Sequence, residues 1–244
     1  MAHDLRYGHL HSDVDWGCDY LEVEIAEAGG VIRVCHVIVK NLGVISEALA
    51  QKVLDTSWMM SLDAGSQRAY RKTVGETAAA LVEVFESARV SSEVGAEFGE
   101  IMVSIGSTKA LEKIFNHVVL PIAELWKPQL KQNEGFDFHT VCTEQLINFG
   151  EAKYSGGTSP HGSAIIQSEK FLKAEKHLRD YVHLRELAPA EAVNNLNNDS
   201  FGIVISFSIN ANDPLKVLSN AIESAVDKFG LEKVKAIYLV GVSR

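Results

Sequence analysis

The second part of this chain alternates helix-like and strand-like segments, and that order leaves few folds open to it. Apolar residues at helical spacing predict helices, and short apolar or alternating runs between turn residues predict strands. In chain order the predicted segments are helices over 92–105 and 111–125, strands over 136–142 and 146–153, a helix over 163–187, a strand over 201–209, a helix over 214–229 and a strand over 234–242. Strands interleaved with helices favour an α/β domain with a central mixed sheet flanked by helices.

Residues 1–90 predict a smaller α+β elaboration of that core, which then spans 91–244. Alternating apolar residues over 20–39, around Gly29 and Gly30, predict a β-hairpin, and helices are predicted from Ser46 and over 70–88. The sequence leaves open whether this part joins the core or forms a small lobe on it.

The first 17 residues are polar, with no clear period. His9-Leu10-His11-Ser12-Asp13 superficially matches a metal-hydrolase H-x-H-x-D motif, but no further ligands follow downstream. A flexible polar N-terminus is therefore the favoured interpretation, and the segment 61–68 is expected to be a loop.

The charge balance limits the kind of partner that the chain can hold unaided. Its 244 residues carry a formal net charge of −9, whereas proteins that coat duplex nucleic acid present net positive faces. The three cysteines, Cys18, Cys35 and Cys142, form no C-x-x-C pair and are expected to be reduced thiols in a cytoplasmic protein. No apolar run reaches membrane-spanning length, and the polar N-terminus does not resemble a signal peptide.

Three charged residues stand in the two strand-like runs near the middle of the chain. Asp137 follows Gly135-Phe136, and Glu151 and Lys153 lie two residues apart after Gly150. Because side chains two apart on a strand share a face, Glu151 and Lys153 are expected side by side, with Asp137 across a hairpin. Two carboxylates offer the oxygen ligands that a divalent cation prefers, and a neighbouring ammonium can steady water or phosphate charge. This pattern favours metal-dependent phosphodiester hydrolysis.

The sequence around the Glu151-Ala152-Lys153 triplet supports a functional site more strongly than the triplet itself does. An E-x-K triplet occurs by chance in many chains, and on a surface hairpin the ion pair would contribute little. On a half-buried strand face the same charges are costly unless they are paired or used. The preceding predicted helix adds two acidic candidates, Glu97 and Glu100, and the helical wheel slightly favours Glu97.

Over roughly residues 92–190 the chain resembles the PD-(D/E)XK nuclease superfamily. The resemblance implies a restriction-endonuclease-like core, Asp137 and Glu151 as ligands of Mg²⁺ or Mn²⁺, and Lys153 as the catalytic lysine. It also implies a further glutamate just before an apolar run of the upstream helix, which ranks Glu100 ahead of Glu97 while both remain candidates. The family's proline before the aspartate is replaced by Phe136, a common variation.

More narrowly, Glu97-Phe98-Gly99-Glu100, Gly135-Phe136-Asp137-Phe138-His139 and Gly150-Glu151-Ala152-Lys153-Tyr154 are similar to the HamA family, the nuclease subunits of the bacterial Hachiman anti-phage defence system. That resemblance implies a HamB-like helicase partner that restrains the nuclease until it senses damaged or invading DNA. A partner that brings the DNA would account for an acidic nuclease.

Residues of the predicted helix over 163–187 are candidates for contact with DNA. Lys170 and Lys173 belong to a basic group that also includes Lys176, Arg179 and Arg185, and it could follow the sugar-phosphate backbone. Gln167 could reach the scissile phosphate, as a polar residue does in some members of the superfamily. A solvated helix face explains the basic group about equally well, and a surface glutamine is the simpler interpretation of Gln167.

A second class of function remains possible, a non-catalytic nuclease-like module that docks a partner protein. The intact Asp137, Glu151 and Lys153 count against it, because a degenerate site would tolerate their loss.

Two other catalytic motifs are not found in the sequence. The histidines pair with no recognisable serine or cysteine elbow, and Gly156-Gly157 is not followed by the lysine of a phosphate-binding loop.

Overall fold

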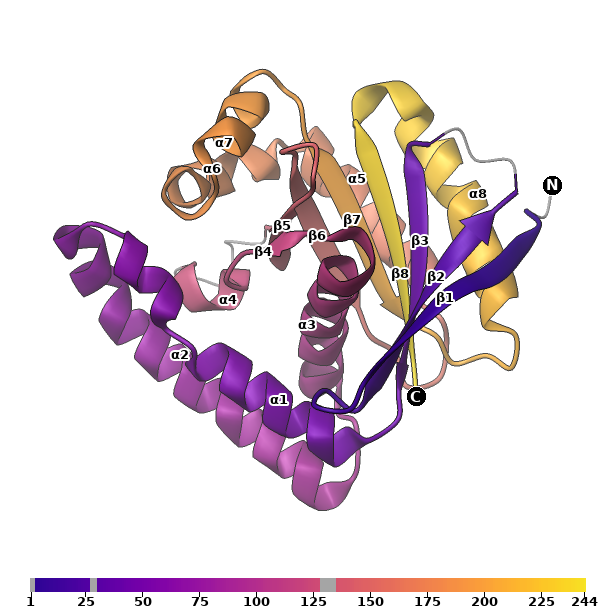
Figure 1. Ribbon diagram of the computed structural model, residues 1–244, viewed down its shortest axis with the longest axis horizontal. Coiled ribbons are helices and arrows are strands. Elements are labelled where there is room, and N and C mark those ends of the chain that lie inside the picture. Colours follow the sequence, from indigo (N-terminus) through magenta and orange to yellow (C-terminus); the bar gives the residue numbers. More distant parts are fainter. Residues whose placement is uncertain (1–2, 27–29, 128–134) are drawn as a thin grey trace.

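The computed structural model describes residues 3–26, 30–127 and 135–244, and these form an α/β fold around one eight-stranded mixed sheet (Figure 1). The strand order is β1-β2-β3-β8-β7-β6-β5-β4. The strands are β1 (Leu5–Asp13), β2 (Cys18–Ile25), β3 (Ile32–Val39), β4 (Val118–Val119), β5 (Phe138–Val141), β6 (Ile147–Lys153), β7 (Gly202–Ser208) and β8 (Ala236–Ser243). The neighbours β3, β8, β7 and β6 are parallel, and antiparallel strands extend both edges.

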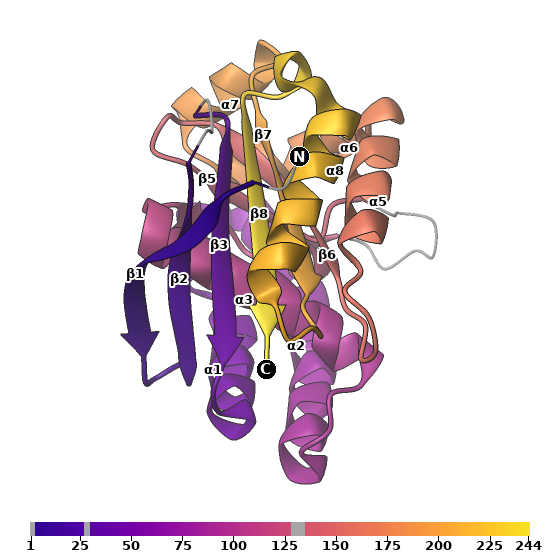
Figure 2. The ribbon, with the colours of Figure 1, turned by 90° about the vertical axis from the view of Figure 1, so that its right-hand side faces the viewer.

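Helices cover both faces of this sheet. They are α1 (Leu42–Leu54), the 3₁₀ helix η1 (Ser57–Ser61), α2 (Ala64–Ser91), α3 (Ala96–Phe115), α4 (Ala123–Trp126), α5 (His161–Lys173), α6 (Lys176–Leu187), α7 (Ala190–Asn197) and α8 (Pro214–Lys233). Figure 1 shows α3 on one face, with α1 and α2 outside it, and Figure 2 shows α5 and α8 side by side on the other. In the described part of the chain, no helix has both the length and the apolarity to cross a membrane.

Alternation along the central strands divides the apolar side chains between two cores. On β6, Ala152 faces the core under α3, whereas Ile147 and Phe149 face the core under α5 and α8. A strand covered on both faces must be apolar on both, and β6 is buried from Ile147 to Ala152. The side chain of Glu151 is therefore buried and has almost no contact with solvent.

The N-terminal strands belong to the same sheet as the strands that follow residue 91. The register of the parallel pair β3 and β8 runs from Ile32 beside Ile237 to Ile38 beside Ser243. The predicted hairpin over 20–39 corresponds to β2 and β3, and its Gly29 lies outside the described residues. The division at residues 90 and 91 stays a prediction, but the two parts share one continuous set of strands.

The N-terminus is not the flexible segment that the sequence suggested. Residues Leu5–Asp13 form β1, which pairs with β2 from Leu5 beside Ile25 to Asp13 beside Cys18. The expectation failed because an edge strand is satisfied by main-chain hydrogen bonds on one side and leaves most of its side chains in solvent. A largely polar sequence is compatible with that position.

The second helix begins earlier than its apolar spacing predicted. The Asp63 carboxylate accepts hydrogen bonds from the amides of Gly65 and Ser66, so α2 starts at Ala64 within a segment predicted to be a loop. This is an ordinary N-cap, which satisfies amides that lack a partner in the first turn.

Two predicted helices are interrupted. In place of a helix over 111–125, α3 ends at Phe115, Asn116 adopts the left-handed conformation that asparagine tolerates, and β4 and α4 follow. The predicted helix over 163–187 is two helices, because Glu175 is left-handed with φ 52° and separates α5 from α6. No glycine or proline marks this second break, so apolar spacing carried no sign of it.

Candidate active site

Asp137 stands at the open end of the hairpin formed by β5 and β6. Its amide donates to the carbonyl of Gly150 at 2.8 Å, and its Oδ2 accepts from the amide of Ala152 at 2.7 Å. Because β5 begins only at Phe138, the Ala152 amide lies beyond the last strand pair, and the Asp137 carboxylate takes the place of a main-chain acceptor. The predicted aspartate is thus anchored beside the strand that carries Glu151 and Lys153.

Glu151 and Lys153 project from the same face of β6, as the two-residue spacing required. The Lys153 Nζ lies 3.0 Å from Glu151 Oε1. The Glu151 side chain is 0% exposed and that of Lys153 is 23% exposed, so the pair runs from the interior toward the surface. Among the described residues Glu151 Oε2 has no hydrogen-bond partner, which leaves a buried carboxylate with capacity for a further ligand.

Helix α3 brings Glu100 to the same place. Its Oε1 lies 3.8 Å from Lys153 Nζ. The close approach depends on Gly99, where an added Cβ would lie 2.3 Å from the ring of Tyr154, the residue after Lys153. The glycine in Glu97-Phe98-Gly99-Glu100 therefore lets α3 rest against the end of β6.

Glu97 lies elsewhere. It is exposed in the first turn of α3 and lines an open groove between α2 and α3, together with Glu83 and Glu93. Of the two upstream candidates, the structure brings Glu100 to Lys153 and turns Glu97 toward α2.

A fourth carboxylate, Glu124, was not predicted from the sequence. It lies on the short helix α4, its Oε2 is buried, and within the described ranges that oxygen has no hydrogen-bond partner. Glu124 interacts electrostatically with Asp137 and Glu100. The available signal was a single acid in the apolar stretch Leu120–Trp126, but the assignment of that stretch to a longer helix hid it. Glu100, Glu124, Asp137 and Glu151, with Lys153, are called the carboxylate cluster below.

Burial sets the electrostatics of the carboxylate cluster. It raises the pKa of Asp137 to about 6 against the hydrogen bond from Ala152, and burial followed by the charge of Asp137 raises the pKa of Glu124 to about 8. The pKa of Glu151 is also raised well above its usual value, by burial and by Asp137, although Lys153 opposes this. Burial alone would lower the pKa of Lys153, but the Glu151 carboxylate outweighs it and the pKa rises. When its acids are ionised, the cluster holds more negative charge than Lys153 neutralises.

This donor set suits a hard divalent cation. Carboxylate oxygens are the ligands that Mg²⁺ and Mn²⁺ prefer, and two buried carboxylate oxygens, on Glu124 and Glu151, have no partner in the described chain. The side chains are not already arranged as a cage, since nowhere in the described ranges do three His, Cys, Asp or Glu side chains surround one point as metal ligands would. The fit rests on donor chemistry and uncompensated charge.

The predicted nucleic-acid contacts lie on α5, which packs on β6 and β7. Gln167 is half-buried, Lys170 is exposed, and Lys173 pairs with Glu169 at 2.8 Å. No hydrogen bond or ion pair links these three side chains to the carboxylate cluster in the part of the chain that the structure describes.

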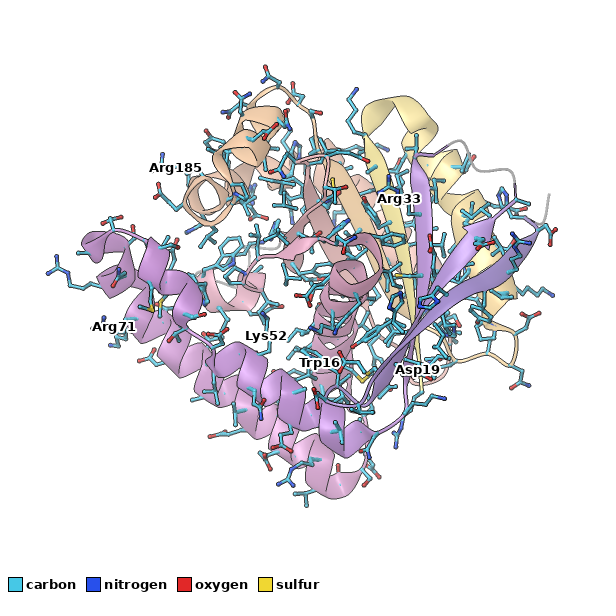
Figure 3. All side chains as sticks on the ribbon, viewed as in Figure 1. Trp16, Asp19, Arg33, Lys52, Arg71 and Arg185 are labelled. Atoms are coloured by element: carbon cyan, nitrogen blue, oxygen red, sulfur yellow. The ribbon has the colours of Figure 1, made fainter. Side chains whose placement is uncertain are left out.

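The predicted basic group is divided by the break between α5 and α6. Lys176 is buried with its Nζ 4.1 Å from the centre of the Phe171 ring. Arg185 points outward from α6 and pairs with Glu186 at 3.2 Å (Figure 3). These residues do not form one continuous basic face.

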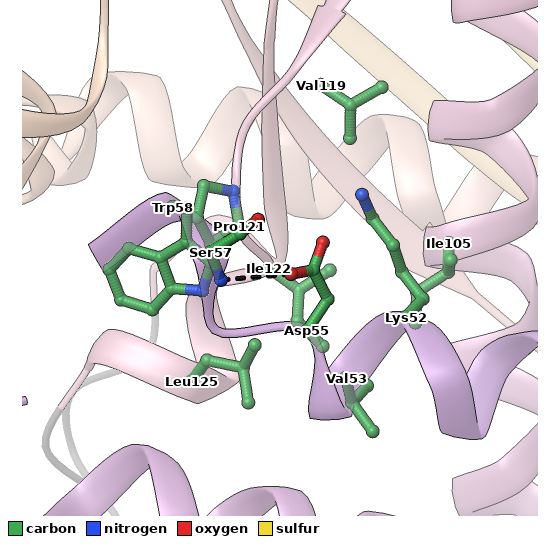
Figure 4. A pocket seen from close by; sticks show the side chains of 10 residues that line it. All are labelled: Lys52, Val53, Asp55, Ser57, Trp58, Ile105, Val119, Pro121, Ile122 and Leu125. Atoms are coloured by element: carbon green, nitrogen blue, oxygen red, sulfur yellow. Dashed lines mark hydrogen bonds between the residues drawn. The ribbon is translucent and has the colours of Figure 1, made fainter. Parts of the chain in front are cut away.

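A separate cavity of about 200 Å³ lies between α1, η1, α3 and α4. Figure 4 shows Trp58 on one side, Lys52 on the other and Asp55 between them, where it accepts a hydrogen bond from the amide of Ser57 at 2.9 Å. None of the predicted site residues lines this cavity, so the carboxylate cluster and the cavity are different places in the molecule.

No protein-family model, curated protein or solved structure matches this chain. Any function must therefore be argued from the residues and their geometry.

Proposed function

We propose that this chain is a nuclease that hydrolyses DNA phosphodiester bonds with a divalent cation, Mg²⁺ or Mn²⁺, at the carboxylate cluster. One observation carries the proposal. Side chains at positions 137, 151 and 153, predicted from their residue types, spacing and strand context, lie together at the end of one hairpin. Glu151 is fully buried, and one of its oxygens lacks a hydrogen-bond partner among the described residues. A buried carboxylate without a structural partner is costly, and perturbed titratable groups gather at functional sites.

The residues divide the chemistry by position. Asp137 and Glu151 would hold the cation. Glu100 and Glu124, which interact electrostatically with Asp137, would add oxygen ligands after movement of their side chains or would hold water molecules of the cation. The bound cation supplies positive charge that makes water more acidic and offsets charge on the phosphate. Lys153, which reaches from Glu151 toward the surface, can donate a hydrogen bond to the attacking water or to a phosphate oxygen. The Ala152 amide keeps the Asp137 carboxylate facing β6.

The surrounding architecture supports this assignment. From α3 to β7 the chain forms a mixed sheet in which β4, β5 and β6 are antiparallel and β7 is parallel to β6, with α3 on one face and α5 on the other. A restriction-endonuclease-like core was expected from the sequence to have such a mixed sheet between helices. We include this finer fold assignment in the proposal.

The proposal also extends to a partner. DNA binding depends on lysine and arginine side chains that neutralise phosphates. A chain with net charge −9 and a divided basic group is therefore expected to bind DNA weakly by itself. We therefore propose that a helicase subunit, of the HamB-like kind expected from the resemblance, delivers DNA and restrains cleavage within an anti-phage defence complex. Gln167, Lys170 and Lys173 remain the proposed contacts with the strand near the site. A helicase gene beside the gene for this chain, and co-purification of the two products, would support this part.

Cleavage of supercoiled plasmid with Mg²⁺ or Mn²⁺ tests the proposal. Lys153→Met and Glu151→Gln should each lower the rate by about 10²- to 10³-fold, because each removes a group that stabilises developing charge or holds the cation. Glu97→Gln is the matched control, since Glu97 is an acid of the same α3 helix that faces a different groove. Equal cleavage by wild type and Lys153→Met would refute the assigned site. The assay is repeated with the helicase present, since the partner is proposed to deliver the DNA.

Cation binding separates the nuclease from a docking module. Calorimetric titration of wild type with Mn²⁺ should show binding that disappears in Glu151→Gln and persists in Glu97→Gln. If wild type binds no Mn²⁺ and cleaves no DNA with or without the helicase, the chain is better described as a nuclease-like module that docks a partner.

A further inference from the structure

A second cluster of buried charge contacts the main chain next to Asp137. Lys127 follows α4, and its Nζ lies 3.0 Å and 3.1 Å from the two carboxylate oxygens of Asp180 on α6. Asp180 Oδ2 also lies 3.0 Å from His139 Nε2 on β5. Lys127, Asp180 and His139 are called the lysine network below, and their side chains are 14%, 5% and 0% exposed.

The lysine network is tied to the main chain that leads into the carboxylate cluster. The Lys127 Nζ donates to the carbonyl of Phe136 at 2.6 Å, and that carbonyl belongs to the peptide unit joining Phe136 to Asp137. A Cβ at Gly135 would lie 2.7 Å from Lys127 Nζ and 3.4 Å from Asp180 Oδ1, so a larger residue there would displace the lysine from its partners. His139, two residues beyond Asp137, is held from the same carboxylate. Asp137 is thus bracketed on both sides along the chain.

The partners of the network fix its hydrogen-bonding roles. A carboxylate only accepts hydrogen bonds, so His139 donates to Asp180 through an Nε2–H and Lys127 donates to both Asp180 and Phe136. The Lys127 ammonium also lies over the ring of Trp126, 5.3 Å from its centre, which restricts its direction. A buried ammonium with three defined neighbours has little freedom to release the carbonyl that it holds.

We propose that the lysine network is a positioning device for Asp137, which keeps the Asp137 carboxylate against the Ala152 amide and thereby in place for the carboxylate cluster. Lys127, Asp180 and His139 are positioning residues and are not proposed to touch a substrate. The effect expected on cation binding and cleavage rests on the proposed function, whereas the effect on the Asp137 carboxylate does not.

Hydrogen exchange at the Ala152 amide measures this positioning without a cation or a substrate. The Ala152 amide donates to Asp137 Oδ2, so its exchange reports how firmly that carboxylate is held. In Lys127→Met the Ala152 amide should exchange about tenfold to a hundredfold faster, since a hydrogen bond from a buried charged group has been removed. The amide of Val240 in β8, which lies between two parallel strands, reports any loss of global stability in the same variant. The free energy of opening at Ala152 should stay below that at Val240, because Ala152 is expected to exchange through a local opening.

Lys109 offers a matched control. It also pairs with a carboxylate, Glu112 at 2.6 Å, and lies over a tryptophan, 5.4 Å from the centre of the Trp16 ring. Lys109→Met should leave exchange at Ala152 unchanged. Lys127→Arg, which retains a cation that can donate to both Asp180 and Phe136, should restore most of the protection that Lys127→Met loses.

The proposal is wrong if Ala152 exchanges no faster in Lys127→Met than in Lys109→Met. It is also wrong if Ala152 and Val240 have the same free energy of opening in Lys127→Met, because both would then exchange by global unfolding. Should Lys127→Met fail to fold, Lys127→Met combined with Asp180→Asn removes the unpaired buried charge and is measured in its place. Mn²⁺ affinity is then compared in the folded variants. Faster exchange at Ala152 with no Mn²⁺ binding in wild type would support the network and reject the proposed function.

Discussion

The carboxylate cluster and the lysine network are neighbours, yet they treat buried charge in opposite ways. In the lysine network one carboxylate faces one ammonium and one imidazole. Burial would raise the pKa of Asp180, but the hydrogen bonds and charges of His139 and Lys127 outweigh it, and the pKa lies below its usual value. In the carboxylate cluster four acids surround the ammonium of Lys153. The charge of Lys127 also acts on Asp137 and Glu124, yet burial raises the pKa of these two acids and of Glu151.

This difference distinguishes two uses of buried polar groups. A balanced cluster fixes geometry, because breaking it leaves a buried charge without a partner. A cluster with unmatched charge of one sign lowers stability as it stands and gains free energy from any ligand of the opposite sign. We expect substitutions in the two clusters to have different effects, and measurements of stability and of Mn²⁺ affinity test that contrast.

The largest effect is expected in the lysine network. Asp180→Leu leaves the Lys127 ammonium buried without a carboxylate, and removal of one member of a buried ion pair costs about 3–5 kcal/mol. The free energy of unfolding is measured by urea denaturation. Glu112→Leu, which breaks the more exposed pair with Lys109, is the control and should cost about 1 kcal/mol or less. A loss equally small for Asp180→Leu would remove the contrast between the clusters.

A second effect is expected from pH in the carboxylate cluster, where ionisation of the buried acids lowers the stability of the folded protein. Unfolded carboxyl groups ionise near pH 4, whereas the folded pKa values of Asp137 and Glu124 are about 6 and about 8. Between these values the folded state binds more protons than the unfolded state, so stability falls as pH rises from pH 5 to pH 8. Thermal unfolding of the metal-free protein measures this fall.

Glu124→Gln identifies the groups responsible for the pH dependence. The amide cannot ionise, so the variant should lose less stability between pH 5 and pH 8 than wild type. Saturating Mn²⁺ should likewise reduce the loss of wild-type stability between pH 5 and pH 8, because the bound cation compensates the charge of the ionised acids. A wild-type stability that rises over this pH range would show that the acids are compensated in the folded protein.

The smallest effect separates the two glutamates of α3. Glu100 lies 3.8 Å from Lys153 and is half exposed, so Glu100→Gln should weaken Mn²⁺ binding by about fivefold or less, an effect of about 1 kcal/mol. Glu97→Gln should leave the affinity unchanged, because Glu97 faces the groove toward α2. Calorimetric titration of both variants compares them directly. Equal weakening by the two substitutions would mean that overall negative charge, and not the position of Glu100, sets the affinity.

The hairpin of the candidate site was predictable because its information is local. The two-residue period of a strand is enough to place Glu151 beside Lys153, and the short connection between two strand-like runs is enough to bring Asp137 to them. These placements are confirmed by the ion pair at 3.0 Å and by the hydrogen bond from Ala152 at 2.7 Å. The α/β class with a mixed sheet followed from the same alternation of segments.

Other features depend on contacts that sequence spacing does not contain. Glu124 reaches the site because the chain leaves its helix at Asn116 and forms α4, a break that apolar spacing did not show. The choice between Glu97 and Glu100 depends on the packing of Gly99 against Tyr154, which are far apart in sequence. The left-handed Glu175 divides the basic group without any glycine or proline to signal it.

The position of β8 has a consequence for how this protein acquires its structure. β8 lies between β3 and β7, yet it follows every other strand along the chain, so the strands on its two sides stay unconnected until it inserts. Pairing that spans nearly the full sequence is slow to form, and exposed strand edges are open to pairing with other chains in the meantime. A chain shortened before Ala236 would present two incomplete sheets with unpaired central edges, and we expect it to aggregate during synthesis.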